Sequence, residues 1–225
     1  MQFLTDVLDW SEVWALGIPL SVLLFRRNED RSLRPVIIYV WLAFLINVAI
    51  DTIMAINIYF KRDLFSNNFL YNTHSVIRFA LFSFYFIKLQ PGSFTNIKKI
   101  VAGISLLFLA INFTIFENFF NYNSFSGNLH TAEAYLLLVC CMLYYLTELK
   151  SDRDDLLSTP HFWVVTGLGI YVVVNFFVFL FYIPMVDVDL DLAVNIWYIH
   201  NIAFIIFCLF LTKAFYGSFR YKPAV

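Results

Sequence analysis

Residues 35–59 read PVIIYVWLAFLINVAIDTIMAINIY, an apolar run in which Asp51 is the one charged side chain. A helix rises about 1.5 Å per residue, so about 20 consecutive apolar residues are needed to cross the hydrocarbon core of a bilayer. This run is long enough to do so, and it carries too few polar side chains to pack as an exposed helix of a soluble domain. It therefore predicts a membrane-spanning helix.

Six other segments repeat this pattern along the chain. Together the predicted spans are residues 10–25, 35–59, 69–88, 97–116, 129–149, 161–183 and 192–215. Pro35, Pro160 and Pro184 are expected at the ends of spans, where a missing N–H costs little, whereas Pro19 lies inside the first span. The predicted fold class is an all-α polytopic membrane protein, with residues 1–225 forming a single seven-helix transmembrane domain.

The composition supports lipid as the solvent of this chain. Hydrophobic residues make up 61% of it and charged residues only 14%, whereas a soluble domain needs about a quarter of its residues charged. No basic stretch is long enough to indicate nucleic-acid binding. Cys140, Cys141 and Cys208 lie within apolar runs and are expected to be small core residues. The loops are too short to hold a separate catalytic domain.

The distribution of Lys and Arg predicts the orientation, because cytoplasmic loops of membrane proteins are enriched in these residues. The loops after the first, third and fifth spans, with the C-terminal tail, contain twelve of them, and the opposite side contains two, Lys61 and Arg62. The twelve are Arg26, Arg27, Arg31, Arg34, Lys88, Lys98, Lys99, Lys150, Arg153, Lys213, Arg220 and Lys222. The N-terminus is therefore expected outside and the C-terminus in the cytoplasm.

Several polar side chains within the spans are predicted to share one depth, in the extracytoplasmic half of the bilayer. An ionisable group in hydrocarbon costs at least about 2.5–3.5 kcal/mol, so such groups must be paired or must line a polar cavity. Arg78 stays charged and needs an anion, for which Asp51 and Glu133 are candidates. One interpretation is an Arg–carboxylate pair that holds helices together, and another is a pocket for a small polar ligand, a lipid headgroup or protons. The predicted ligand-binding residues are Asp51, His74, Arg78, Glu133, His200 and Asn201.

A metal-dependent intramembrane lipid hydrolase is an alternative. His74, His130, Glu133 and His200 offer nitrogen and oxygen ligands suited to zinc, which could activate water for attack on an ester or amide. Hydrolases of the alkaline-ceramidase and adiponectin-receptor type pair two histidines four residues apart on the last helix. Here residues 200–204 read HNIAF, without the second histidine. A small transporter is a further alternative, although the two halves of the chain show no convincing repeat.

Two local patterns carry further expectations. Gly167-Leu168-Gly169 predicts a point of close helix packing. Residues 71–74 (YNTH), 128–135 (NLHTAEAY), 159–163 (TPHFW) and 197–201 (WYIHN) resemble, in this order, a family of uncharacterised bacterial seven-helix membrane proteins. Arg78 departs from that family, where a Glu is expected, and this counts against a carboxylate-based metal site.

The resemblance implies a bacterial inner-membrane location, and it implies a partnership with a sensor histidine kinase or another membrane protein, because some members are encoded beside such kinases. The leading hypothesis from the sequence is accordingly a receptor-like or sensor-associated integral membrane protein.

Overall fold

The computed structural model of the chain describes residues 2–25, 30–61, 66–89, 94–117, 124–150 and 155–218. These residues form helices and connecting segments, and none of them belongs to a β-strand. The α-helices are α1 (Gln2–Asp9), α2 (Ser11–Phe25), α3 (Arg34–Phe60), α4 (Asn68–Lys88), α5 (Thr95–Ile111), α6 (Gly127–Leu149), α7 (Pro160–Val188) and α8 (Leu190–Ser218). Short 3-10 turns at Arg31–Leu33 and Leu156–Ser158 precede α3 and α7, and a π-helical turn at Asn112–Phe116 ends α5.

Five helices within the described ranges are long and apolar enough to cross a membrane, which makes the chain a multi-pass membrane protein embedded in lipid. They are Arg31–Phe60, Thr95–Phe116, Gly127–Leu149, Pro160–Val188 and Leu190–Gly217. The shorter α2 is also apolar. The all-helical class is confirmed, and apart from Trp10 every residue of the predicted spans is helical. The segment predicted at residues 69–88 forms α4, which is less apolar because it carries Arg78 and other polar side chains toward its neighbours.

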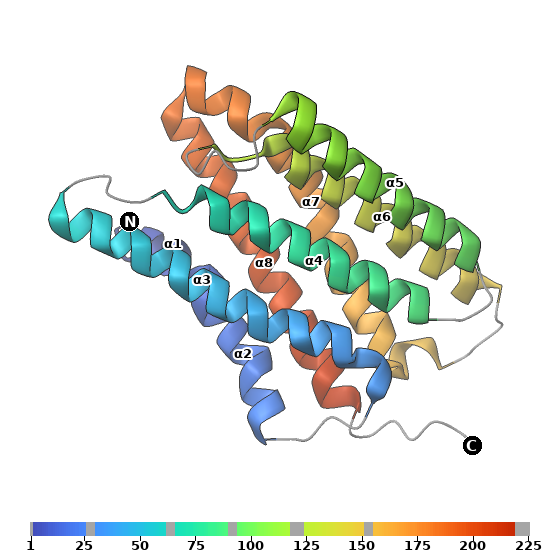
Figure 1. The fold of residues 1–225 in the computed structure, drawn as a ribbon. Coiled ribbons are helices and arrows are strands. Elements are labelled where there is room, and N and C mark those ends of the chain that lie inside the picture. The colour runs from blue at the N-terminus through green and yellow to red at the C-terminus, as the bar shows by residue number, and fades with distance from the viewer. Residues whose placement is uncertain are drawn as a thin grey trace.

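Consecutive long helices run antiparallel, so α2, α4, α6 and α8 begin at the end of the bundle next to α1, and α3, α5 and α7 begin at the opposite end (Figure 1). We call these the α1 end and the opposite end. The contacts form a closed ring in the order α2, α3, α4, α6, α7 and α8, with α8 returning to α2. Helix α5 packs on the outside of α4 and α6. The ring therefore encloses a shared interior to which helices distant in sequence contribute.

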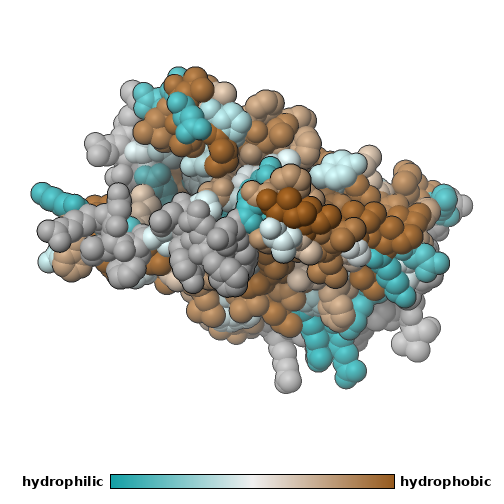
Figure 2. Space-filling view, turned by 45° about the horizontal axis from the view of Figure 1, so that its top comes forward, coloured by the Kyte–Doolittle hydropathy of each residue, from teal (hydrophilic) through white to brown (hydrophobic). Residues whose placement is uncertain are grey.

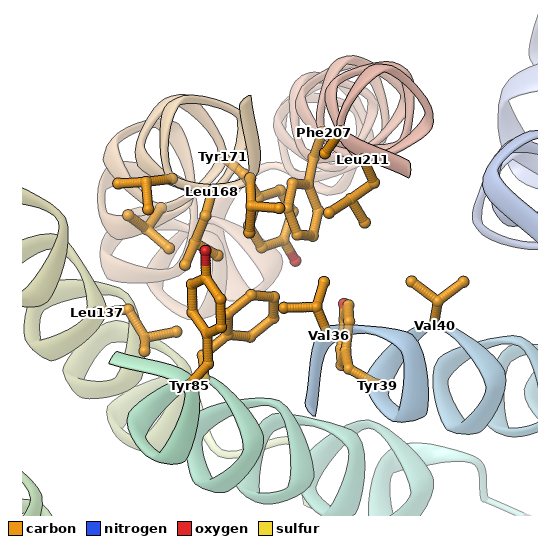
Figure 3. Packing of buried hydrophobic residues seen from close by; sticks show 14 of the residues in the cluster. Val36, Tyr39, Val40, Tyr85, Leu137, Leu168, Tyr171, Phe207 and Leu211 are labelled. Atoms are coloured by element: carbon orange, nitrogen blue, oxygen red, sulfur yellow. The ribbon is translucent and has the colours of Figure 1, made fainter. Parts of the chain in front are cut away.

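Aromatic side chains fill the middle of this ring. Tyr39 of α3, Tyr85 of α4, Tyr171 of α7 and Phe207 of α8 are almost completely buried and meet between the helices (Figure 3). The three cysteines are also buried and free, as expected for core residues. On the outside, large apolar side chains are exposed to the surroundings, and hydrophobic residues cover much of the face in Figure 2, with hydrophilic ones mainly toward its edges.

Helices α7 and α8 approach closely at Gly167, as its sequence context predicts. A Cβ atom at this position would lie 2.4 Å from Cβ of Phe210 on α8, which is closer than two carbon atoms can pack. At Gly169 the nearest atom to such a Cβ is Cβ of Cys141, at an ordinary 3.9 Å. Gly167 is therefore the member of this pair that allows α7 and α8 to approach.

The helix ends match the sequence at two prolines and differ at a third. Pro35 and Pro160 occupy the first turns of α3 and α7, as expected. Pro184 was predicted to end a span, and this prediction is wrong because α7 continues through it to Val188. The chain turns instead at Asp189, whose side chain accepts a hydrogen bond from the backbone N–H of Leu192 at 3.0 Å and so caps the start of α8.

Part of the charge count that predicted the orientation falls outside the described residues. Arg26, Arg27, Arg62, Arg153, Arg220 and Lys222 belong to this group. The antiparallel order of the helices agrees with the predicted alternation of loops between the two ends of the bundle.

Candidate functional site

A buried ion pair, together with a tyrosine hydroxyl, joins α4, α6 and α7. Arg78 of α4 donates from Nε to Oε1 of Glu133 at 2.5 Å and from Nη2 to Oε2 at 2.7 Å, which is the two-pronged geometry that an arginine and a carboxylate favour. Arg78 Nη1 also donates to the hydroxyl of Tyr171 at 2.7 Å, and Ser75 Oγ donates to Glu133. Of the two candidate anions for Arg78, the structure therefore selects Glu133 on α6. We call this group the arginine centre.

The arginine centre is closed to solvent and balanced in charge. Arg78 and Glu133 are 5% and 3% exposed, and both carboxylate oxygens accept hydrogen bonds. Losing one partner of such a buried pair costs about 3–5 kcal/mol, because the other charge is left without compensation. The geometry thus agrees with the interpretation of a pair that holds α4, α6 and α7 together.

A second hydrogen-bonded group lies beside it and is centred on His200 of α8. Its Nε2 lies 2.8 Å from Oε1 of Glu12 at the start of α2, and its Nδ1 lies 2.5 Å from Oδ1 of Asn175 on α7. Asn175 Nδ2 donates to the backbone carbonyl of Tyr171 at 2.8 Å, so Asn175 Oδ1 faces His200 as an acceptor. His200 Nδ1 is therefore the donor in this contact.

The contact between His200 and Glu12 must then hold a single proton. Either the imidazole is charged and donates to a carboxylate, or a neutral carboxyl group donates to Nε2, and the pair is electrically neutral in both forms. Glu12 Oε2 also accepts a long hydrogen bond of 3.4 Å from the hydroxyl of Tyr71 on α4. Because Glu12 lines an open cavity, this proton lies where a charged ligand can influence it.

That cavity, of about 300 Å³, lies at the α1 end and is acidic. Three carboxylates from three helices line it, Asp9 of α1, Glu12 of α2 and Asp51 of α3, and the other lining residues are mainly aromatic or amide side chains. The full lining is Asp9, Glu12, Asp51, Met54, Asn67, Asn68, Tyr71, Phe125, Tyr182, Val194, Trp197, Tyr198 and Asn201. No Lys, Arg or His is among these residues. We call this cavity the acidic pocket.

Two residues that line the acidic pocket each carry a buried acceptor atom with no hydrogen-bond partner among the described residues. Asp51 is 7% exposed and its Oδ2 is unpaired, and Asn201 is 1% exposed and its Oδ1 is unpaired. The amide nitrogen of Asn201 donates to the backbone carbonyl of Leu8 at 3.0 Å, which fixes the amide so that its oxygen is the free atom. An unsatisfied buried acceptor is costly, and these two belong to residues that line one cavity, so they are candidate acceptors for a donor that enters it.

Two of the predicted site histidines lie apart from these groups. His74 stacks on Tyr39 with ring centroids 5.8 Å apart, and its Nε2 has no partner in the described part of the chain. His130 stacks on Phe125 at 4.5 Å, and neither of its ring nitrogens has a partner there. Both side chains are buried among aromatic rings rather than directed into the acidic pocket.

The residues proposed as zinc ligands are consequently not gathered into one site. Glu133 uses both oxygens on Arg78 and Ser75, and both nitrogens of His200 are occupied by Asn175 and Glu12. In the described ranges, no three His, Cys, Asp or Glu side chains form a group that could hold a metal ion. The guanidinium of Arg78 bound to Glu133 also disfavours a second cation there. The geometry gives no support to the hydrolase alternative.

The opposite end of the bundle has its own histidine contact. His161 at the start of α7 lies with Nε2 3.1 Å from Oγ of Ser32 and with Nδ1 3.0 Å from the hydroxyl of Tyr85. Its Nε2 is also 3.6 Å from Oδ2 of Asp30. His161 therefore ties the start of α7 to α4 and to the turn before α3.

The six residues predicted to bind a ligand divide between these environments. Asp51 and Asn201 line the acidic pocket, and His200 lies behind Glu12 of its wall. Arg78 and Glu133 form the arginine centre, and His74 lies against Tyr39. Arg78 and His200 still share one neighbour, Tyr171, whose hydroxyl accepts from Arg78 and whose ring lies 5.8 Å from that of His200.

Sequence reasoning left out several residues that complete the site. Glu12 was visible as a carboxylate in an apolar segment, and its place in the shortest predicted span concealed its importance. Asp9 and the aromatic walls gave no distinct signal, because acidic residues before a span and aromatic residues at its ends are common in membrane proteins. Tyr171 and Ser75 bond the ion pair only because of the way their helices face, and residue spacing alone does not reveal this.

Comparison of the chain with known protein families, with characterised proteins and with solved structures finds no match.

Proposed function

We propose that this chain is a receptor-like, sensor-associated protein of the bacterial inner membrane, with seven spans, its N-terminus outside and its C-terminus in the cytoplasm. In this arrangement the α1 end faces outward, and the acidic pocket receives a small positively charged ligand. The single observation that carries the proposal is a cavity lined by Asp9, Glu12 and Asp51, with no cationic side chain among the described residues of its wall. Such a site attracts cations and repels anions.

The pocket is connected to the rest of the bundle by hydrogen bonds. Glu12 contacts His200, His200 contacts Asn175, and Asn175 bonds the backbone of Tyr171, whose hydroxyl accepts from Arg78. The connected side chains come from α2, α8, α7 and α4. A cation beside Glu12 competes with His200 for the same carboxylate, so occupancy alters the first contact in this series. A ligand that favours one arrangement of these helices over another shifts their equilibrium, which is sufficient for a receptor.

At the opposite end of the bundle, a shift between helix arrangements would change contacts that a lipid or a partner protein can sense. His161 bonds Ser32 and Tyr85, so a movement of α7 relative to α3 or α4 changes a polar contact near the predicted cytoplasmic surface. Basic residues flank this end, including Arg31, Arg34 and Lys213. They suit anionic lipid or an acidic partner surface, and a sensor histidine kinase is the partner that the family resemblance suggests.

The experiment measures thermal stabilisation of the full-length protein, purified in phosphatidylcholine nanodiscs, by cations and a neutral analogue. Choline and 3,3-dimethyl-1-butanol have nearly the same shape and differ in charge, and ethylammonium supplies a smaller cation. We expect at least one of the two cations to stabilise the protein more than the neutral alcohol does, because ligands that bind only the folded state raise its stability. Asp51→Asn should remove this difference, and Asp187→Asn, the same change on an exposed residue outside the pocket, should keep it. Equal responses to cations and alcohol would overturn the proposal.

The receptor role is tested by hydrogen exchange of the backbone amides of residues 155–165, with and without the cation that binds. A changed exchange rate near His161 supports transmission from the pocket. Binding without any change there would leave a binding protein and contradict the receptor role.

A further inference from the structure

The unpaired atoms of the acidic pocket identify the kind of cation that suits it. Asp51 Oδ2 and Asn201 Oδ1 belong to different helices, α3 and α8, and both can only accept hydrogen bonds. A fully methylated ammonium group has no N–H to donate to them, and among the described residues no three His, Cys, Asp or Glu side chains form a group that could hold a metal ion. A primary or secondary ammonium group has N–H donors, and it also carries the charge that the three carboxylates attract.

The rest of the pocket wall is suited to an apolar body next to that ammonium group. Trp197 lies at ring-centroid distances of 5.5 Å from Tyr71, 5.0 Å from Tyr182 and 6.0 Å from Phe125. The planes of Trp197 and Tyr71 are 88° apart, and those of Trp197 and Phe125 are 73° apart, so these rings of the pocket wall pack edge to face. Such rings bury aliphatic or aromatic groups well and attract a nearby cation.

We propose that the acidic pocket binds a primary or secondary amine with an apolar body, whose ammonium N–H groups donate to Asp51 and Asn201 while the body lies against Trp197 and its neighbouring rings. This proposal rests on the proposed function, since it names the ligand class of the same pocket. A volume of about 300 Å³ is at the lower end for ligand pockets, so the amine is a small one.

A primary ammonium group could come from a soluble amine or from the headgroup of phosphatidylethanolamine. In that lipid a phosphate lies two carbons from the nitrogen, and its negative charge would approach Asp9 and Glu12 in the pocket wall. An amine with an uncharged body avoids this repulsion. The soluble amine is therefore the source that the pocket favours.

The test compares three probes of similar shape on the full-length protein in phosphatidylcholine nanodiscs. They are 2-phenylethylamine, its N,N,N-trimethyl derivative, which keeps the charge and loses all N–H donors, and 2-phenylethanol, which is neutral. We expect the primary amine to bind at least about tenfold more tightly than the trimethyl derivative, because the latter leaves buried acceptors unpaired. Binding is measured as a dissociation constant by titration calorimetry.

Variants show whether Asn201 is the cause of this preference. Asn201→Leu should reduce the difference between the two cations several-fold, and Asn195→Leu, the same change on an exposed part of α8 outside the pocket, should leave it intact. Thermal unfolding shows whether each variant is folded. Since Asn201 also bonds Leu8, the smaller Asn201→Ala serves as a second variant if the first does not fold. A preference unchanged in the folded variant would overturn the role of Asn201.

The outcomes separate this inference from the proposed function. Equal affinity for both cations, with weaker binding of the alcohol, would overturn the amine and leave the cation pocket standing. No cation binding at all would overturn both. In nanodiscs that contain phosphatidylethanolamine, unchanged amine affinity supports a soluble ligand, whereas competition by the lipid identifies its headgroup as an occupant with the same ammonium chemistry.

Discussion

The arginine centre and the acidic pocket are two groups of charged side chains in one bundle, and they are built in opposite ways. In the arginine centre one cation meets one carboxylate, and both carboxylate oxygens accept hydrogen bonds. In the acidic pocket three carboxylates share a wall whose described residues include no cationic side chain, and Asp51 and Asn201 keep acceptors without a partner among those residues. The first arrangement is complete by itself, whereas the second contains acceptors whose donors are not among the described residues.

This difference teaches how to interpret polar residues inside a membrane protein. Burial and charge alone do not separate a structural group from a binding site, because Arg78, Glu133 and Asp51 are all less than a tenth exposed. The two groups differ in that the charged atoms of the arginine centre have partners, whereas Asp51 Oδ2 has none among the described residues and Asp51 also lines a cavity. His200 belongs to both sides of this comparison, since its nitrogens are occupied but one of its partners, Glu12, lines the pocket.

The largest effect is expected from breaking the arginine centre. Glu133→Gln leaves the guanidinium of Arg78 buried without an anion and should lower the free energy of unfolding by about 3–5 kcal/mol. Chemical unfolding in detergent, followed by circular dichroism, measures this change. The double variant Arg78→Met with Glu133→Leu removes both charges and should recover most of the loss. A single variant within about 1 kcal/mol of the native protein would contradict a structural role for the pair.

A smaller loss of stability is expected from a substitution at Gly167, where α7 packs closely against α8. A methyl group there would approach Phe210 to 2.4 Å, so Gly167→Ala should destabilise the protein by about 1–3 kcal/mol through overpacking. Gly169→Ala is the matched control, because its added methyl group meets Cys141 at 3.9 Å and should change little. The same unfolding assay compares the two. Equal effects would mean that the approach of α7 and α8 is not the limiting contact.

Much of the fold could be predicted because the bilayer restricts what an apolar segment can do. A run such as residues 35–59 has to satisfy its backbone polar groups internally, so length and hydropathy predict a helix. Pro184 shows the limit of this reasoning, since α7 continues through it for one more turn. The division between α7 and α8 lies instead at Asp189, whose side chain caps the start of α8. Which helices pack against one another around the ring could not be predicted, because all of the helices carry similar apolar residues on several faces.

The sequence predicted which residues belong to the site better than it predicted which of them contact one another. The cost of polar groups in lipid singled out Asp51, Arg78, Glu133, His200 and Asn201 from the sequence. Which of these meet depends on the rotation of each helix about its axis, and a helix turns by about 100° per residue, so small errors in the predicted ends change the facing side. Glu12, in a helix of 15 residues, acquires its role only because α2 packs on α8.

The smallest change in stability is expected in the acidic pocket, and it should be a gain rather than a loss. Asp51→Asn removes a charge that has an unpaired oxygen and lies in one cavity with Asp9 and Glu12. Without ligand, the variant should be as stable as the native protein or more stable by up to about 1 kcal/mol, because residues that serve binding are often held at a cost to stability. The unfolding assay in the absence of amines measures this. A loss as large as that of Glu133→Gln would mean that Asp51 has a structural partner. The charges of the acidic pocket would then be paired within the protein, as those of the arginine centre are.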